Sequence, residues 1–253
     1  MFDDNATFLT TDRDEDGSKY RANFELYPYV ESEEYALFKG KQFGEHGEKG
    51  ARHAEICTVR TLRNSHPRFQ DWDFYMMCSK QAALLAAVFN KLLMPRTEVR
   101  FSLPLRAEMD TAWNANSIIG FIILAFRPHR KRLKEDEVVV VEDFLGKTTS
   151  LYISDSGFVG PNESDILQAF GHFTWNFTNE RLVICGLRGV RRKGHFRLSD
   201  PTIHSVSSEN GSGVGQDFGP RDKGLDGIIS FFRYHRCNDI CRNMPTPTAL
   251  YYS

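Results

Sequence analysis

Three side chains near the C-terminal end of the chain have the types and the spacing of metal ligands. His235, Cys237 and Cys241 lie in the segment HRCNDIC. The two cysteines are four residues apart and would share one face of a helix, whereas His235 would point elsewhere. A helix must therefore end or bend there if all three side chains are to converge. Thiolate and imidazole groups in tetrahedral geometry are the usual ligands of structural zinc. A fourth ligand has to come from elsewhere, and any of the other seven histidines could supply it.

Two other interpretations of this segment stay open on spacing alone. The cysteines are equally compatible with small core residues, and His235 with a side chain at the surface. A zinc knuckle that binds nucleic acid is the third interpretation, and the charge of the chain disfavours it. The sequence has 32 basic and 33 acidic residues, so it lacks the basic excess of nucleic-acid-binding domains.

The composition supplies enough apolar material for one large domain or two closely packed lobes, because 41% of the 253 residues are hydrophobic. No apolar run approaches the roughly 20 residues that span a bilayer. The acidic N-terminal segment lacks the apolar stretch that a secretory signal contains. We therefore expect a cytoplasmic protein with no membrane partner and no nucleic-acid partner. The five sparse cysteines then indicate reduced thiols rather than disulfides.

Short strands followed by one long helix are predicted for the first part of the chain. Residues 1–19 have few apolar side chains and many aspartates, which indicates an acidic flexible arm. Between residues 20 and 63, aromatic and β-branched runs broken by glycines indicate strands with tight turns. Residues 72–94 are rich in Ala, Leu and Met, and they predict a helix that stops at Pro95.

Strands and helices follow in mixed order through the rest of the chain. The apolar runs at 118–126 and 137–145 flank a charged turn and predict a long antiparallel hairpin. The later elements are expected to be a strand at 99–105, a strand at 149–154, a helix at 163–175, a strand at 181–187, a Gly/Ser-rich loop at 206–220 and a helix from about Leu225. This order predicts an α+β domain in two lobes, with a β-rich N-lobe at about 20–141 and a mixed C-lobe at about 142–253.

Seven motifs between Val141 and Cys241 resemble the α-kinase family of atypical protein Ser/Thr kinases, which includes the myosin heavy-chain kinases, the elongation-factor kinase and the channel-kinases. In chain order they read VEDFLGK, LYISDSGFV, AFGHFTW, RLVICGLRGV, FRLSDPTIHS, DFGPRDKG and FFRYHRCNDIC. They keep the order and spacing of the family, whereas residues 21–141 match it more loosely. The resemblance implies a two-lobed kinase-like fold, ATP with magnesium as cofactor, and a protein substrate that the sequence does not identify.

The resemblance also implies a structural zinc. In the family it is held by the histidine of an AFxHFT motif together with an HxCxxxC segment. The matching positions are His172, His235, Cys237 and Cys241. Such sites are closed, so the metal is expected to stabilise the C-lobe without touching substrate.

The residues that perform phosphoryl transfer in the family match this chain only in part. A D-L-Q-G-V motif in the family carries an aspartate and a glutamine, and here Gly186 and Arg188 stand at those positions. A second family aspartate, in a T-D-P motif, matches Asp200, which is the expected catalytic residue. Losing one acid–base group typically lowers a rate by about 10²–10⁴-fold. The sequence therefore predicts a degenerate catalytic site.

The expected nucleotide-binding positions are also partly altered. The family's lysine on the ATP phosphates matches Arg60, the helix glutamate that pairs with it matches Gln81, and the hinge glutamate matches Glu142. The asparagine of a glycine-rich loop is replaced by Asp222, whose carboxylate could still ligate magnesium. The cofactor-binding set implied by the resemblance is Arg60, Glu142, Arg188, Gly219, Asp222 and Gly224.

Three functions are compatible with these matches. The expected one is a pseudokinase or nucleotide-binding scaffold of α-kinase type. The alternative is an active atypical Ser/Thr protein kinase that uses Asp200 and Asp222 for magnesium. The third is a zinc-stabilised interaction domain without a nucleotide site. The sequence identifies neither a protein partner nor a regulatory signal.

Overall fold

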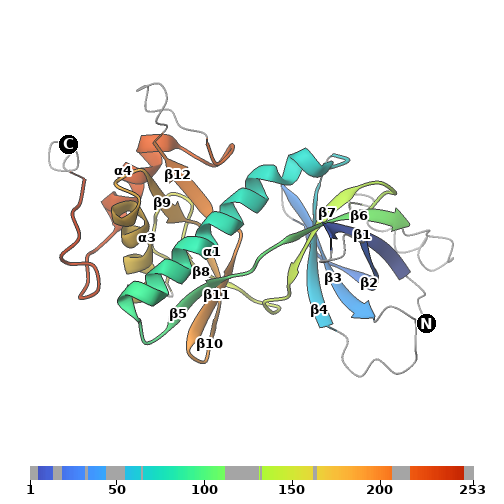
Figure 1. Ribbon diagram of the computed structural model, residues 1–253, viewed down its shortest axis with the longest axis horizontal. Helices are drawn as coiled ribbons and strands as arrows, with labels where there is room; N and C mark the ends of the chain where they lie inside the picture. Colours follow the sequence, from blue (N-terminus) through green and yellow to red (C-terminus); the bar gives the residue numbers. More distant parts are fainter. Residues whose placement is uncertain are drawn as a thin grey trace. The chain divides into compact units, whose positions relative to one another are not determined.

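The protein is represented by a computed structural model, which describes residues 5–13, 19–31, 34–43, 55–63, 65–111, 131, 133–161, 164–206 and 217–247 (Figure 1). The chain forms two compact units. Unit 1 comprises Met1–Asp73 and Pro104–Phe144, and unit 2 comprises Phe74–Leu103 and Leu145–Ser253. The mixture of helices and sheets agrees with the predicted α+β class. Among the described residues, no helix combines the length and the hydropathy needed to cross a lipid bilayer.

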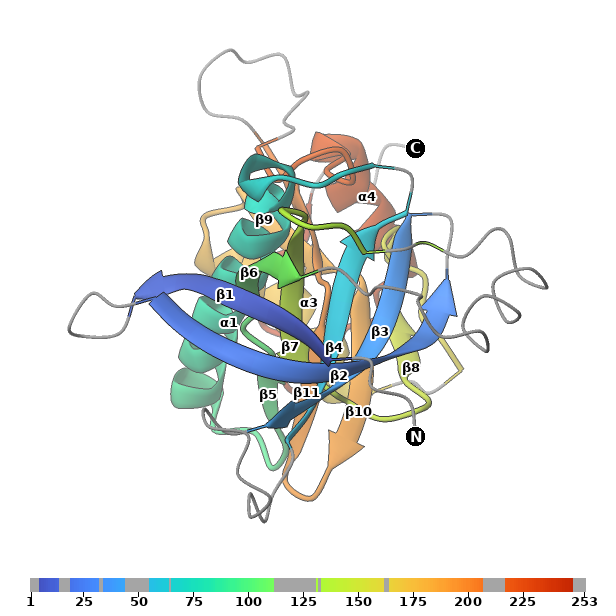
Figure 2. The same cartoon turned by 90° about the vertical axis from the view of Figure 1, so that its right-hand side faces the viewer.

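Unit 1 contains a closed antiparallel barrel (Figure 2). Around the barrel its strands follow the order β1 (Asn5–Arg13), β2 (Lys19–Glu31), β3 (Tyr35–Phe43), β4 (Glu55–Leu62), β7 (Val138–Asp143) and β6 (Leu105–Thr111). Closure pairs the backbone of every strand on both sides and leaves no exposed edge. Small and branched side chains such as Ala36, Val59, Ala107 and Val139 fill the buried core.

The flexible arm expected at residues 1–19 is wrong for Asn5–Arg13. These residues form β1, which pairs with β2 on one side and with β6 on the other. The aspartates of the segment concealed a run of β-forming residues, since Thr7–Thr11 reads TFLTT. The first run of the predicted hairpin, at 118–126, lies outside the described residues, whereas the second run forms β7.

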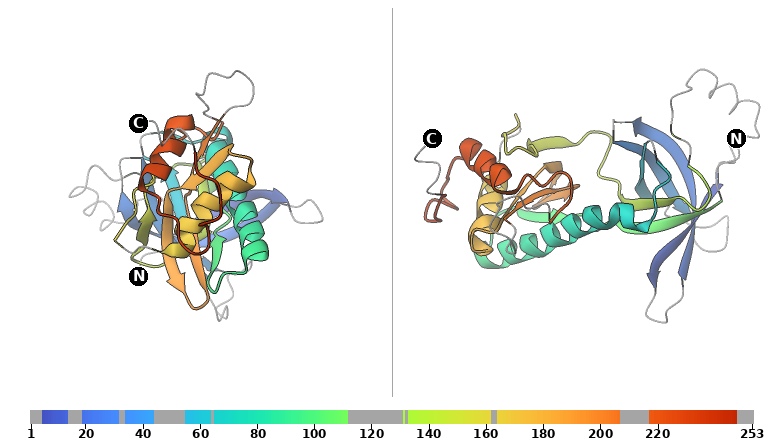
Figure 3. Two further views of the ribbon diagram at one scale, coloured as in Figure 1. Left: turned by 90° about the vertical axis from the view of Figure 1, so that its left-hand side faces the viewer. Right: turned by 90° about the horizontal axis from the view of Figure 1, so that it is seen from above.

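Unit 2 combines two sheets with helices (Figures 1 and 3). One sheet has the order β5 (Glu98–Phe101), β11 (His195–Ser199), β10 (Leu187–Arg192) and β8 (Ser150–Ile153); the other pairs β12 (Thr202–Ser205) with β9 (Leu182–Cys185). The predicted helices are confirmed as α1 (Asp73–Leu93), α3 (Asp165–Phe177) and α4 (Gly224–Tyr234). A short 3₁₀ helix, η1 (Phe69–Trp72), precedes α1.

Helix α1 and strand β5 belong to unit 2, although the predicted N-lobe included them. The buried residues of α1 recur every three or four positions, as in an amphipathic helix, and they join the same hydrophobic core as α3. The Phe89 ring, for example, lies 5.5 Å from that of Phe170 and 5.3 Å from that of Phe173. Strand β5 pairs in parallel with β11, which lies almost a hundred residues later in the chain. These contacts are long-range, so local sequence patterns did not reveal them.

Candidate functional site

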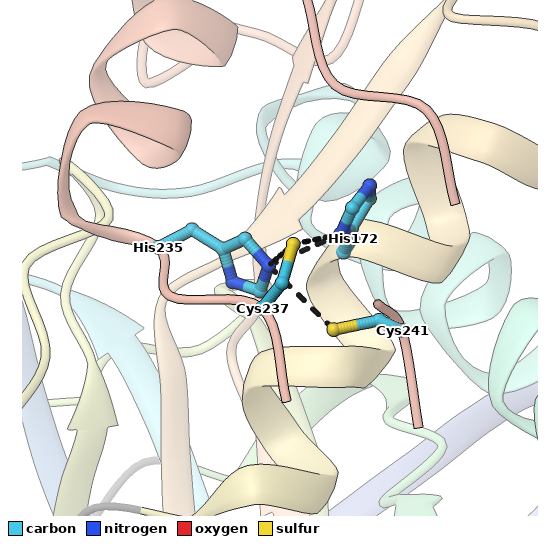
Figure 4. A group of neighbouring side chains, drawn as sticks. All are labelled: His172, His235, Cys237 and Cys241. Atoms are coloured by element: carbon cyan, nitrogen blue, oxygen red, sulfur yellow. Dashed lines mark hydrogen bonds between the residues drawn. The ribbon is translucent and has the colours of Figure 1, made fainter. Parts of the chain in front are cut away.

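The four predicted zinc ligands converge at one point of unit 2 (Figure 4). His172 comes from the middle of α3, and the other three come from the end of α4 and the segment after it. His235 is the C-cap of α4 and has an extended backbone, with φ −69° and ψ 134°. This is the helix end that the spacing of His235, Cys237 and Cys241 required. The four candidate ligand atoms lie within 4.8 Å of one another.

The separations between these atoms fit tetrahedral zinc. Zinc–nitrogen bonds of about 2.0 Å and zinc–sulfur bonds of about 2.3 Å place ligand atoms roughly 3.3–3.8 Å apart. His172 Nδ1 lies 3.0 Å from His235 Nε2, and Cys237 Sγ lies 3.6 Å and 3.5 Å from these two nitrogens. Cys241 Sγ lies 3.7 Å from His235 Nε2. One ion can therefore be reached by all four residues.

The outer nitrogens of the two histidines fix which ring atoms face this cluster. His172 Nε2 lies 2.7 Å from the carbonyl oxygen of Pro245, and His235 Nδ1 lies 2.9 Å from Gln168 Oε1. Both partners are acceptors, so each outer nitrogen carries the proton and each inner nitrogen presents a lone pair. Two lone pairs that face each other at 3.0 Å repel unless a cation lies between them. The second hydrogen bond is also the usual way in which a zinc-binding histidine is oriented.

Burial shapes the protonation of the cluster in the absence of metal. It lowers the pKa of His172, and it lowers the pKa of His235 to about 4, with the neighbouring His172 acting in the same direction. No proton therefore bridges the two rings at neutral pH. Burial raises the pKa of Cys241 to about 11, so a bound cation has to displace a thiol proton. All five cysteines of the chain are free thiols.

In unit 1, the structure brings two of the expected nucleotide-binding residues together. Arg60 of β4 and Glu142 of β7 are both buried, and Arg60 Nη2 lies 2.8 Å from Glu142 Oε1. The guanidinium of Arg60 also lies over the ring of Tyr35, 4.9 Å from its centroid. The cation expected on the ATP phosphates is thus neutralised by the glutamate expected at the hinge.

In unit 2, the predicted catalytic residue Asp200 is held by an arginine that sequence reasoning missed. Asp200 follows β11 with a left-handed backbone, at φ 54°, and its Oδ1 lies 2.6 Å from Arg221 Nη2. Arg221 stands directly before Asp222 in the DFGPRDKG motif, but nothing in its spacing indicated this ion pair. Arg188, by contrast, is exposed on β10, and no hydrogen bond or ion pair of its side chain occurs among the residues described.

The carboxylate of Asp222 organises the loop that contains it. Asp222 is buried, and its two oxygens accept four hydrogen bonds. The donors are the backbone amide and the hydroxyl of Ser205 at 2.9 Å and 2.6 Å, the amide of Phe218 at 3.3 Å and the amide of Gly224 at 2.9 Å. Gly219 and Gly224 have positive φ angles of 89° and 60°, which glycine adopts without strain. The predicted cofactor residue Asp222 therefore ties this loop to β12.

The turn that follows β8 lies beside Gly186. Strand β8 pairs antiparallel with β10, with Ile153 opposite Leu187, and Gly186 is the residue directly before β10. The Gly186 amide donates a hydrogen bond to the carbonyl oxygen of Ser154 at 3.2 Å. The next residue in this turn is Asp155, which sequence reasoning did not single out.

The carboxylate of Asp155 is anchored on one side. Thr202 Oγ1 donates to Asp155 Oδ1 at 2.8 Å, and His204 Nε2 lies 2.6 Å from the backbone oxygen of Asp155. Burial lowers the pKa of His204, so the ring is neutral at physiological pH and donates from Nε2. Its Nδ1 accepts from the amide of Lys223 at 3.1 Å, which links this turn to the loop of Asp222.

Comparison with known proteins identifies the family. The model of the Alpha-kinase family matches residues 36–241. The chain is 28% identical to the eukaryotic elongation factor 2 kinase of Caenorhabditis elegans, over 72% of this chain and 22% of that protein. It is 33% identical to myosin heavy chain kinase B of Dictyostelium discoideum, over 44% of this chain and 14% of that protein. The matched segments thus span less than a quarter of these curated relatives.

Solved structures show the same fold. An alpha kinase from Entamoeba histolytica superimposes with a TM-score of 0.72 at 18% identity, covering 98% of this chain and 94% of that chain. The inactive alpha-kinase domain of myosin-II heavy chain kinase A, complexed with ATP, superimposes with a TM-score of 0.66 at 16% identity, covering 97% of this chain and 99% of that chain. These likenesses show the fold, and the family match over residues 36–241 establishes that the chain belongs to the alpha-kinase family.

Proposed function

We propose that this alpha-kinase domain binds ATP with magnesium and transfers phosphate very slowly or not at all. The observation that carries the proposal is Gly186, which has no side chain where the family places a carboxylate. Phosphoryl transfer depends on positioning and on charge neutralisation around the metal and the phosphates. Removal of one such group leaves binding contacts in place while the rate falls. The ATP complex of a structurally similar domain supports nucleotide binding.

Arg188 is proposed to favour nucleotide binding over turnover. It stands at the position of a neutral glutamine in the family and is exposed on β10. A guanidinium at this position repels a magnesium ion but pairs strongly with phosphate oxygens. An arginine therefore substitutes for part of the metal's charge without orienting a nucleophile.

The active-kinase alternative, with magnesium on Asp200 and Asp222, has weaker support. The Asp222 carboxylate accepts four hydrogen bonds within its own loop, so we assign it an organising role rather than a metal-binding role. Asp200 keeps its proposed catalytic role, but Arg221 neutralises its charge. The assignments of Arg60, Glu142, Gly219 and Gly224 to nucleotide binding stay predictions that rest on the resemblance.

The domain is also proposed to hold one structural zinc on His172, His235, Cys237 and Cys241. The support is the tetrahedral spacing of the four atoms and the orientation of the two imidazoles. All four ligand positions are taken by protein atoms, so the metal supplies folding free energy and no chemistry.

Magnesium and ATP together should raise the melting temperature of the purified domain. A ligand that binds only the native state stabilises it by about 2.7 kcal/mol at a hundredfold excess over its Kd. Differential scanning calorimetry with increasing Mg·ATP measures this shift, and Mg·GTP is the control for general salt and phosphate effects. A melting temperature that Mg·ATP leaves unchanged would favour an interaction domain without a nucleotide site.

A further inference from the structure

The space in front of Gly186 is filled by the carboxylate of another residue. A Cβ atom built on Gly186 would lie 2.6 Å from Asp155 Oδ1 and 2.9 Å from both the amide nitrogen and the hydroxyl of Thr202. These distances are shorter than normal contacts, so a side chain at 186 is excluded in this arrangement by Thr202 and, at the shortest distance, by the carboxylate of Asp155. The site has lost its carboxylate at position 186, but a carboxylate from the neighbouring turn lies beside that position.

The turn that carries Asp155 is held firmly. The Ser154 amide donates to the carbonyl oxygen of Phe158 at 2.8 Å, and the Phe158 amide donates to Ser154 Oγ at 3.0 Å. Ser230 of α4 donates to the carbonyl oxygen of Ser156 at 2.7 Å. With the contact from His204 to the Asp155 carbonyl, both ends of the turn are fixed to neighbouring elements. The carboxylate therefore does not have to be ordered when a ligand arrives.

Asp155 differs from the other two carboxylates of this region because one of its oxygens remains available to a cation. Asp222 is saturated by four donors, and Asp200 is paired with Arg221. Asp155 is exposed; Oδ1 accepts one hydrogen bond from Thr202, and Oδ2 has no hydrogen-bond partner among the residues described. Magnesium prefers carboxylate oxygens and is usually held by one or two of them together with the phosphates of the nucleotide.

We infer that Asp155 supplies the carboxylate that holds the magnesium of Mg·ATP, in place of the side chain missing at position 186. This inference rests on the proposed nucleotide binding. It identifies Asp155 as the residue through which magnesium strengthens the binding of ATP. Thr202 is the positioning residue, because its hydroxyl orients Oδ1 and leaves Oδ2 for the cation. The carboxylate thus comes from the turn after β8 instead of from the residue directly before β10, and its Oδ1 lies 2.6 Å from where a Cβ at position 186 would be.

The test measures ATP affinity with and without magnesium by isothermal titration calorimetry, in wild type and in Asp155→Asn. In wild type, magnesium should tighten ATP binding. Asp155→Asn should weaken Mg·ATP binding by about 10-fold or more, a loss typical for the removal of a group that supports a metal site. Metal-free ATP should bind this variant at least as well as wild type, because one negative charge facing the phosphates is gone. General damage to the fold would weaken both forms of the nucleotide.

Two matched controls complete the test. Asp226→Asn makes the same change at an exposed aspartate of α4 and should leave both affinities unchanged. Thr202→Val should reproduce part of the Asp155→Asn effect, whereas Thr202→Ser, which keeps the hydroxyl, should not. An unchanged magnesium effect in Asp155→Asn would overturn the inference but leave ATP binding intact. Wild-type protein that binds neither form of ATP would instead overturn the proposed function.

Discussion

Substitution Cys241→Ser should remove zinc from the domain and unfold much of unit 2. Structural zinc sites contribute about 10–16 kcal/mol of apparent binding free energy, which is comparable to the roughly 5–15 kcal/mol by which whole domains are stable. We expect about one zinc per chain in wild type and almost none in the variant, measured by plasma mass spectrometry. Urea unfolding followed by circular dichroism should show a large fall in the midpoint.

The matched control is Cys185→Ser, which makes the same substitution at a fully buried thiol of the same hydrophobic core. This control measures how much the free energy of unfolding falls when a hydroxyl is placed in the core, which is about 1–3 kcal/mol. The proposed zinc ligands join α3 to the segment after α4, so only Cys241→Ser should release that segment. A zinc-free preparation that unfolds at the same urea concentration as wild type would contradict the metal site.

Restoring the family's carboxylate at position 186 should require a second change at Asp155. In the Gly186→Asp, Arg188→Gln variant, the new side chain overlaps the carboxylate of Asp155, so this variant should be destabilised and gain little activity. Adding Asp155→Gly removes the shortest of the close contacts, and the remaining ones, at 2.9 Å to the amide nitrogen and the hydroxyl of Thr202, require a small shift of β12. The left-handed φ of 63° at position 186 is one that aspartate tolerates better than most residues. The triple variant should transfer phosphate about 10²–10⁴-fold faster than wild type.

Autophosphorylation with γ-labelled ATP measures these rates, and Asp200→Ala in the triple background is the control for transfer at this site. Equal rates in the double and the triple variant would show that Asp155 does not compete for the space. A wild-type rate already as high as that of the triple variant would support the active-kinase alternative.

The convergence of the four proposed zinc ligands could be predicted from sequence because most of them lie close together in the chain. Three of the four residues fall within one short segment, and their convergence required a helix to end or bend there; α4 does end, with His235 as its C-cap. His172 lies 63 residues from His235, and only the resemblance to the family selected it among the histidines. The packing of α3 against α4 then brings the two rings together, with centroids 4.8 Å apart.

The proposed role of Asp155 could not be predicted, because it depends on the register of two strands that are distant in sequence. Only the pairing of Ile153 with Leu187 places the turn after β8 beside Gly186. The resemblance of the motif to the family implies a lost aspartate at 186, but it cannot indicate which side chain lies beside that position. The assignment of α1 to unit 2 was missed for a similar reason, since it depends on long-range contacts, whereas β1 was missed because aspartates concealed its β-forming run.

The most direct test of the central claim is the fate of ATP bound to an excess of wild-type domain in the presence of magnesium. The domain is incubated with substoichiometric γ-labelled ATP and a protein mixture rich in Ser and Thr acceptors, and the label is then separated by chromatography. We predict that the label is recovered with the protein as intact ATP. Rapid, magnesium-dependent transfer of the label to protein, abolished by Asp200→Ala, would contradict this account.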